Sequence, residues 1–229
     1  MRILFVRHGD PDYKNDCLTE LGKEQAEAVS LRLLPEGISE IYASPYGRAA
    51  ETAAVTASLL ALPVTTLPYM HEIGWSGEDL PFGGHPWSLS ERMLAEENFD
   101  FRAEDWRAHP YFVHNKAREC FDEIAAQFDL FLKQQGYRHE GRRFFCSAAN
   151  EKTIALFSHG GSGACALSHL LHLPFPYVCT VFPYDYTSVI ILEFPVRPGE
   201  YVHPRVELFN DAAHIRGTGR GVQFQQESE

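Results

Sequence analysis

Residues 1–11 read MRILFVRHGDP, and this stretch decides the fold. The apolar run Ile3–Val6 ends abruptly at Arg7-His8-Gly9, which predicts a buried strand that opens into a loop. Four apolar residues are too few for the core of a signal peptide or for a membrane span. Because ligands of open α/β sheets bind where strands end, Arg7 and His8 become the first candidate site residues.

Helical and strand patterns alternate along the chain that follows. Thr19 is expected to cap a helix over residues 20–34, and Ser44-Pro45 is expected to supply the N-cap and first position of a second helix ending near Leu60. The clearest helical spacing predicts a helix over residues 116–135, with Gly136 just past its end. Short apolar runs predict strands at residues 38–43, 64–67, 153–157, 188–194 and 201–209, the last two as antiparallel neighbours, and a further helix is expected after Gly160 up to about His172.

This order predicts an α/β protein, a three-layer α/β/α open sheet that is mostly parallel, within a single domain over residues 1–229. Between residues 75 and 115 the periodicity degrades, and Gly, Pro, Trp and His are frequent. Only short helical pieces are expected there, at about residues 89–97 and 104–108. We interpret the segment as an insertion that forms a lid over the site or, equally well, only covers core.

Composition restricts the class of partner. Thirty-one acidic against 20 basic residues give a formal charge of −11, which argues against binding to nucleic acid or to a membrane surface. Five cysteines without a paired C-x-x-C motif favour a reduced, cytoplasmic protein over a disulfide scaffold. The sequence gives no signal for the oligomeric state.

Histidine stands beside glycine at two predicted strand ends, in Arg7-His8-Gly9 and in Ser158-His159-Gly160. The second junction leads into a helix, whose free N–H groups are suited to an anion. Arg48, near the start of the second helix, and Glu72, just after the third strand, complete the set. Imidazole is a nucleophile near neutral pH, guanidinium binds phosphate oxygens in pairs, and a carboxylic acid can protonate a departing oxygen. The set predicts phosphoryl transfer without a metal or other cofactor.

In this order the motifs resemble the histidine phosphatase superfamily, in its phosphoglycerate mutase-like branch. The resemblance covers roughly residues 1–75 and 150–175, and its motifs are Arg7-His8-Gly9, Leu18-Thr19-Glu20-Leu21-Gly22 with Gln25-Ala26, Tyr42-Ala43-Ser44-Pro45 with Arg48-Ala49 and Thr52, Glu72, and Ser158-His159-Gly160. Asp10 stands where the family commonly has Glu, which keeps the carboxylate.

The resemblance implies a role for each matched position. His8 would be the nucleophile that forms a phosphohistidine, and Glu72 would be the acid–base residue. Arg7, Arg48 and His159 would hold the phosphoryl oxygens, with Gly160 and Asn15 as further phosphate contacts. Nδ1 of His8 is expected to donate to a nearby carbonyl group, which would fix the ring's tautomer. The implied partner is a small phosphorylated substrate.

Several alternatives stay open at this point, among them a serine hydrolase, although no G-x-S-x-G motif occurs, and a non-catalytic regulatory protein. A mutase would need extra basic residues beside the catalytic carboxylate, whereas Glu72 is followed by Ile73-Gly74-Trp75, so hydrolysis is favoured. The segment Gly161–Ala166 matches the G-x-G-x-x-A pattern of dinucleotide-binding proteins, but prolines follow where a returning strand is needed.

His169-x-x-His172 has the spacing of metal ligands. Because no third ligand is evident nearby in the sequence, this spacing favours ordinary core or surface histidines.

Overall fold

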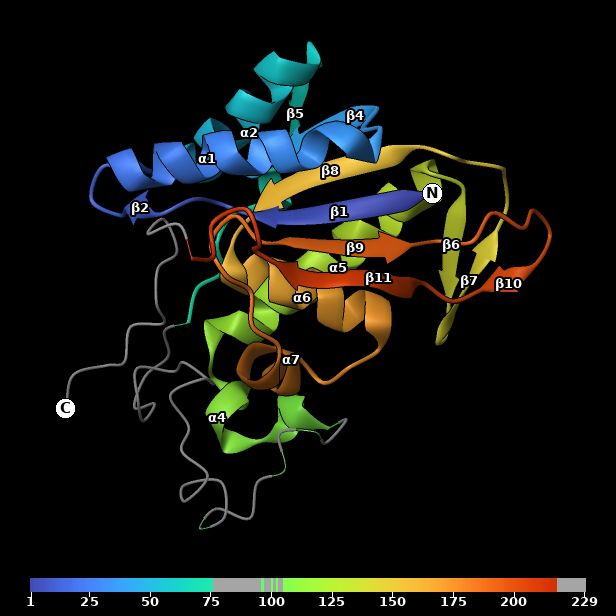
Figure 1. The fold of residues 1–229 in the computed structure, drawn as a ribbon. Coiled ribbons are helices and arrows are strands. Elements are labelled where there is room, and N and C mark those ends of the chain that lie inside the picture. Colours follow the sequence, from blue (N-terminus) through green and yellow to red (C-terminus); the bar gives the residue numbers. More distant parts are fainter. Residues whose placement is uncertain (76–95, 97–99, 101, 103–104, 218–229) are drawn as a thin grey trace.

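A computed structural model describes residues 1–75, 96, 100, 102 and 105–217 of the chain. Its centre is a six-stranded sheet with the order β11-β9-β1-β8-β4-β5 (Figure 1). The strands of this sheet are β1 (Arg2–Arg7), β4 (Glu40–Ala43), β5 (Val64–Thr66), β8 (Thr153–Ser158), β9 (Val189–Glu193) and β11 (Arg205–Asp211).

Strands β1, β8, β4 and β5 run parallel to one another, while β9 is antiparallel to both of its neighbours. This confirms the mostly parallel α/β sheet and the antiparallel pairing of the last two long strands. The register places Arg7 opposite Ser158. The residues that follow, His8 and His159, therefore leave the sheet side by side at the same edge.

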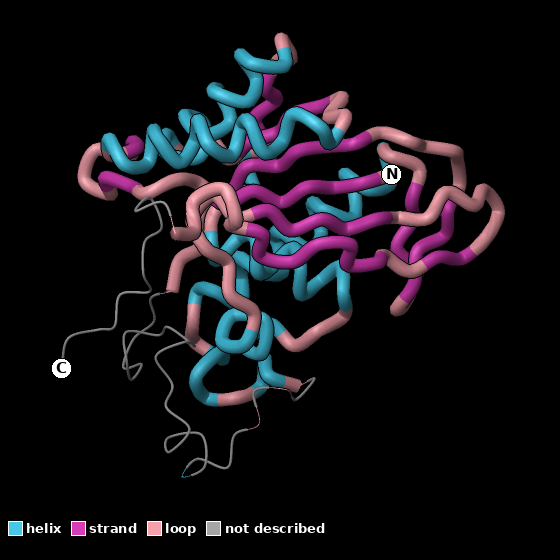
Figure 2. The backbone as a smooth tube through the Cα atoms, viewed as in Figure 1, coloured by secondary structure: helices cyan, strands magenta, loops and turns pink. Residues whose placement is uncertain are grey.

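Helices cover both faces of the sheet, as Figure 2 shows. Helices α1 (Glu20–Leu33) and α2 (Gly47–Leu60) lie on one face, whereas α5 (Lys116–Gln134) and α6 (Gly160–Leu171) lie on the other. Successive side chains of β1 point to opposite faces of the sheet. Leu4 and Val6 pack in the core beneath α1 and α2, and Ile3 and Phe5 pack in the core beneath α5 and α6. Each fully buried side chain of this size stabilises the fold by about 1.5–3 kcal/mol.

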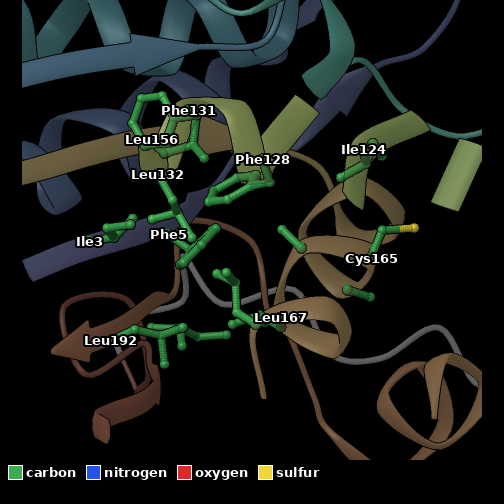
Figure 3. Packing of buried hydrophobic residues seen from close by; sticks show 14 of the residues in the cluster. Ile3, Phe5, Ile124, Phe128, Phe131, Leu132, Leu156, Cys165, Leu167 and Leu192 are labelled. Carbon is green, nitrogen blue, oxygen red and sulfur yellow. The ribbon is translucent and has the colours of Figure 1, made fainter. Parts of the chain in front are cut away.

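Aromatic side chains make up much of the α5–α6 core, seen from close by in Figure 3. Phe5 of β1 stacks on Phe128 of α5 with ring centroids 5.9 Å apart, and Phe128 in turn contacts Phe131. Leu167 of α6 belongs to the same cluster. This packing fixes α6, and therefore its first turn, against the strand that carries His8.

The helix signals are confirmed for α1 and α5. The Thr19 side chain accepts a hydrogen bond from the N–H of Gly22, and that of Asn115 from the N–H of Ala117. Gly136, just past the end of α5, has a φ of 90°, which glycine adopts without strain.

The predicted start of the second helix is wrong. Helix α2 begins at Gly47 with Tyr46 at the N-cap, so Arg48 is its second residue and not its fourth. Ser44 does not cap the helix; its hydroxyl is buried against His159. The tertiary contact with the second histidine outweighs the local preference of serine for the N-cap.

A second, three-stranded sheet is absent from the sequence prediction. It consists of β6 (Tyr137–Glu140), β7 (Arg143–Cys146) and β10 (Tyr201–Val202) in the order β10-β7-β6. The strand expected over 201–209 is therefore two strands, β10 and β11, which belong to different sheets. The short helix α7 (Phe175–Val181) and the two-stranded β2 (Pro11–Asp12) and β3 (Cys17–Leu18) were also not expected.

The predicted lid over 75–115 lies largely outside the described residues, as does the helical piece at 89–97. Its described end contains a 3₁₀ turn at Trp106–Ala108 and the short helix α4 (Pro110–Val113). Trp106 is buried there against Phe112, Phe121 and Phe175. Among the helices of residues 1–75 and 105–217, none is both long and apolar enough to cross a membrane.

Candidate active site

His8 lies directly after β1 and is almost completely buried, with 1% of its surface exposed. Its Nδ1 is 2.7 Å from the carbonyl oxygen of Gly9. Because a carbonyl oxygen can only accept, Nδ1 carries the proton and Nε2 presents its lone pair. This is the tautomer that the sequence analysis expects.

Arg48 approaches that lone pair from α2. Its Nε is 3.4 Å from Nε2 of His8, and its Nη1 is 2.6 Å from Oδ1 of Asp16. The other oxygen of Asp16 accepts from the N–H of Gly47, so one carboxylate holds both the guanidinium and the first turn of α2. Sequence reasoning missed Asp16, because nothing in its local pattern indicates a partner more than 30 residues away.

His159 follows β8, and its ring centroid lies 5.1 Å from that of His8 with the planes at 57°. Its Nε2 is 2.7 Å from Oγ of Ser44, the residue that follows β4. Three neighbouring parallel strands thus each place one residue at the site through their register. Ser44 is a positioning residue that sequence reasoning assigned to a helix cap.

Arg7, the last residue of β1, completes the positive side of the site. Its Nη1 donates to the carbonyl oxygen of Tyr184, and its guanidinium carbon lies 4.2 Å from the ring centre of Tyr186. Its Nε is buried and has no hydrogen-bond partner among the described residues, as expected of a donor that meets an anionic ligand. A Cβ at Gly160 would come within 3.6 Å of this guanidinium, so Gly160 lies beside Arg7.

Glu72 reaches the site from the loop after β5. Its carboxylate accepts hydrogen bonds from the N–H groups of Ile73, Gly161 and Ser162 at 2.9, 3.4 and 3.2 Å. The amides expected to cradle an anion at the start of α6 therefore hold a carboxylate of the chain itself. A side chain at Gly161 would collide with it, since its Cβ would lie 2.5 Å from Oε1 of Glu72.

Burial and neighbouring charge shift the pKa values of these groups in opposite directions. Burial, reinforced by the cations Arg7 and Arg48, lowers the pKa of His8 well below its ordinary value. Burial raises the pKa of Glu72, because the backbone hydrogen bonds and Arg7 offset only part of the cost of the buried negative charge. The shifts favour a neutral imidazole at His8 and a carboxyl group at Glu72 that keeps its proton to higher pH than usual.

Asn15 is not brought together with the other candidates by any described contact. It is exposed in the loop between β2 and β3, and its amide donates to the side chain of Asp12 at 2.7 Å. Its neighbour Asp16 is the residue of this loop that reaches Arg48.

Aromatic rings surround the two histidines. Tyr186 lies 5.4 Å from His8 and Tyr46 lies 5.4 Å from His159, both between ring centroids. Tyr46 also stacks near His71, and Arg48 lies within 5.4 Å of the ring centre of Tyr13. Sequence reasoning did not select these tyrosines, since isolated tyrosines in loops carry no spacing signal.

A family model for the histidine phosphatase superfamily (branch 1) matches residues 3–207. The chain belongs to this superfamily. A probable phosphoglycerate mutase, GpmB, of Yersinia enterocolitica is 30% identical over 186 residues, which are 76% of either chain. The corresponding protein of Yersinia pestis shows the same identity and coverage.

Solved structures of the superfamily share the fold. A phosphoserine phosphatase from Entamoeba histolytica, solved with phosphoserine, superposes with a TM-score of 0.64 at 22% identity, covering 93% of this chain and 98% of its own. A mycobacterial glucosyl-3-phosphoglycerate phosphatase gives a TM-score of 0.63 at 20% identity, with 91% and 98% covered. Membership makes this chain one of a superfamily of phosphatases and mutases, enzymes of phosphoryl transfer.

The glycines that suggested a dinucleotide site have a different role in this fold. A Cβ at Gly161 would meet Glu72, and one at Gly163 would come within 2.4 Å of the ring of Tyr184. Both glycines lie in α6 and make room for side chains of the chain itself.

Proposed function

We propose that the protein hydrolyses a small phosphorylated metabolite through a phosphohistidine formed on His8. The observation that carries this proposal is the arrangement at Nε2 of His8. The hydrogen bond of Nδ1 to Gly9 leaves Nε2 without a proton, and Nε2 accepts a hydrogen bond from the Nε–H of Arg48 at 3.4 Å. A phosphoryl group that displaces this hydrogen bond meets a nucleophile and a cation at once.

In the first half-reaction, Nε2 of His8 attacks phosphorus in line as the bond to the departing oxygen breaks. Glu72 gives its proton to that oxygen and becomes a carboxylate, and the alcohol leaves. The raised pKa of Glu72, which follows from its burial, favours the protonated state that this step requires. Arg7, Arg48 and His159 surround the phosphoryl oxygens as their charge is redistributed.

In the second half-reaction, water attacks the phosphohistidine. Glu72, now ionised, takes a proton from this water, the bond between phosphorus and Nε2 breaks, and inorganic phosphate leaves. The Gly161 and Ser162 N–H groups stabilise the ionised carboxylate between the two steps. Because two guanidinium groups supply the positive charge, the proposed reaction requires no metal ion at this site.

The aromatic rim favours hydrolysis over a mutase reaction. A phosphoglycerate mutase must hold a second anionic group of its substrate, which requires cations around the entrance. Among the described residues, an aromatic ring lies near each of three site residues: Tyr186 near His8, Tyr46 near His159 and Tyr13 near Arg48. We therefore infer a leaving group that is neutral or apolar near the phosphate.

Phosphoglycerate mutase activity is the second candidate, favoured by the 30% identity with the Yersinia proteins. The two functions are separated by measuring phosphate release from a panel of phosphomonoesters beside isomerisation of phosphoglycerate, with wild type and His8→Asn. We expect wild-type release to exceed isomerisation and the variant to lose at least about 10³-fold in kcat/KM. Isomerisation without net phosphate release would show that the protein is a mutase and not a hydrolase. Full activity of His8→Asn would refute both proposed functions.

A further inference from the structure

Three metal-ligating side chains meet far from His8 in sequence and on three different elements. Asp129 comes from α5, His139 from β6 and His169 from α6. Oδ1 of Asp129 is 2.8 Å from Nδ1 of His139 and 2.7 Å from Nε2 of His169. The three ligand atoms all lie within 4.8 Å of one another. The fold thus supplies the additional ligands that the His169-x-x-His172 spacing lacks in the sequence.

We propose that Asp129, His139 and His169 form a binding site for a zinc-class divalent cation, separate from the catalytic centre. Two imidazoles and one carboxylate are a ligand set that Zn²⁺ accepts, with a fourth position for water or another side chain. A cavity of about 270 Å³ borders the cluster, because His169 and His172 both line it. It offers an entry path and room for the fourth ligand.

The distances from Asp129 to the two imidazoles suit a cation after a small adjustment, and the imidazole nitrogens lie within 4.8 Å of each other. Zinc ligands lie about 2.0–2.2 Å from the metal, so ligand atoms of a tetrahedral site are about 3.3 Å apart. The carboxylate of Asp129 must therefore withdraw by about 0.5 Å from each imidazole. Its side chain is 39% exposed and is free on its solvent side to make this movement.

The hydrogen bonding of the cluster is incomplete in its present form. Nε2 of His139 and Nε2 of His172 are buried without a hydrogen-bond partner among the described residues. The rings of these two histidines lie 5.0 Å apart, and both stack near Phe144. Buried polar atoms normally have partners, so the unpartnered Nε2 of His172 indicates a ligand in this region, whereas Nε2 of His139 is the ring nitrogen that faces away from Asp129.

The position of the cluster indicates a structural task. His169 lies in the last turn of α6, whereas His159 precedes its first turn, about 15 Å away along the helix at 1.5 Å per residue. A cation there would fasten α6 to α5 and β6 without touching the phosphoryl group. The site should therefore change stability far more than activity.

The test uses the full chain, treated with a chelator and carrying His8→Asn, so that the catalytic imidazole does not bind metal. We expect calorimetric titration with Zn²⁺ to show one site, and Co²⁺ to give the visible absorption of a four- or five-coordinate ion. Zinc at about 100 times its Kd should raise Tm by roughly 5–10 °C. Asp129→Asn, His139→Asn and His169→Asn should each weaken zinc binding at least about 100-fold.

Matched controls are Glu123→Gln, an exposed carboxylate on the same helix as Asp129, and His114→Asn, an exposed histidine outside the cluster. Both should bind zinc as the parent does. Absence of zinc binding in the parent, or equal binding by the cluster variants and the controls, would overturn the proposal. Circular dichroism shows whether each cluster variant folds without metal. If one does not, the Co²⁺ spectrum of the parent and zinc binding by the other two variants test the proposal. In the wild-type background, Asp129→Asn should leave phosphatase activity without metal unchanged.

Discussion

The two ring nitrogens of His8 have different tasks. Nδ1 donates to Gly9 and fixes the ring, and Nε2 faces Arg48. Burial among cations keeps the ring neutral, which is the state that can attack phosphorus. Burial lowers the pKa of this imidazole and raises the pKa of Glu72. The same buried site therefore favours a neutral nucleophile and a protonated acid.

The acid role of Glu72 can be tested with Glu72→Gln, which keeps the size and loses the proton. We expect kcat/KM to fall by about 10²–10⁴-fold for alkyl phosphates, whose leaving oxygen needs a proton. The loss should be smaller for p-nitrophenyl phosphate, because its phenolate leaves without one. Glu123→Gln, on the exposed face of α5, is the control. An equal loss of kcat/KM on both substrates would show that Glu72 does not protonate the leaving oxygen.

Asp16 anchors Arg48, and Asp16→Asn removes the negative charge from that contact. We expect kcat/KM to fall by roughly 10-fold, because hydrogen bonds to charged groups contribute about 1.5–3 kcal/mol and the guanidinium would be less well held. Inhibition by inorganic phosphate should weaken in parallel. Asp12→Asn alters a half-buried carboxylate at the end of β2, which contacts Lys14 and Asn15 but not Arg48, and should leave both measurements unchanged. Identical behaviour of the two variants would show that Asp16 does not position Arg48.

At the scale of elements, strand register assembles the site. Because β1, β8 and β4 are adjacent and parallel, His8, His159 and Ser44 leave the sheet at one edge. Helix α6 then turns its first N–H groups toward Glu72, which comes from a loop almost 90 residues earlier. The close approach is possible because residue 161 has no side chain.

Gly161→Ala should displace the Glu72 carboxylate, since the new methyl group would lie 2.5 Å from Oε1. We expect at least a roughly 10-fold loss in kcat. Tm should fall as well, because the methyl group would also lie 2.6 Å from Cγ1 of buried Ile73 and 2.9 Å from the ring of Trp75. Gly160→Ala is the matched comparison, as its methyl group would make an ordinary 3.6 Å contact with Arg7. A larger loss from Gly160→Ala than from Gly161→Ala would contradict this view of the first turn.

Elements with a strong local signal were predictable, and those held by distant contacts were not. The apolar run of β1, the Thr19 cap of α1 and the helical spacing of α5 agree with the structure. The hairpin of β6 and β7 was missed, because residues 137–140 are mostly polar and show no alternation of apolar residues. The site followed the same rule: His8, His159, Arg48 and Glu72 stand in recognisable motifs, whereas Asp16, Ser44 and Tyr186 act only through the fold.

For the whole molecule, the buried histidines make stability depend on pH. The pKa values of His8 and His159 are lowered, mainly by burial, so below about pH 6.5 the unfolded chain takes up protons that the native chain does not. The stability that they contribute is complete above their unfolded pKa and is lost as the pH falls below it. Acidification therefore removes the stability that these two histidines contribute.

We expect each of these histidines to lower the free energy of unfolding by about 1.4 kcal/mol between pH 7.5 and 5.5. Urea unfolding at both pH values measures the difference. In His8→Asn the loss should be about 1.4 kcal/mol smaller than in wild type, because asparagine does not titrate. His114→Asn, at an exposed position, should not change the pH dependence. An unchanged slope in His8→Asn would show that His8 titrates alike in the native and unfolded states.

The proposed mechanism requires that a phosphoryl group becomes bonded to His8. Rapid quenching of the enzyme during turnover, followed by peptide mass spectrometry under alkaline conditions that preserve phosphohistidine, measures this directly. We predict one phosphoryl group on the peptide that contains residues 1–11, located at His8 and absent from His8→Asn. Turnover at the full rate with phosphate on no residue, or on a residue other than His8, would contradict the account.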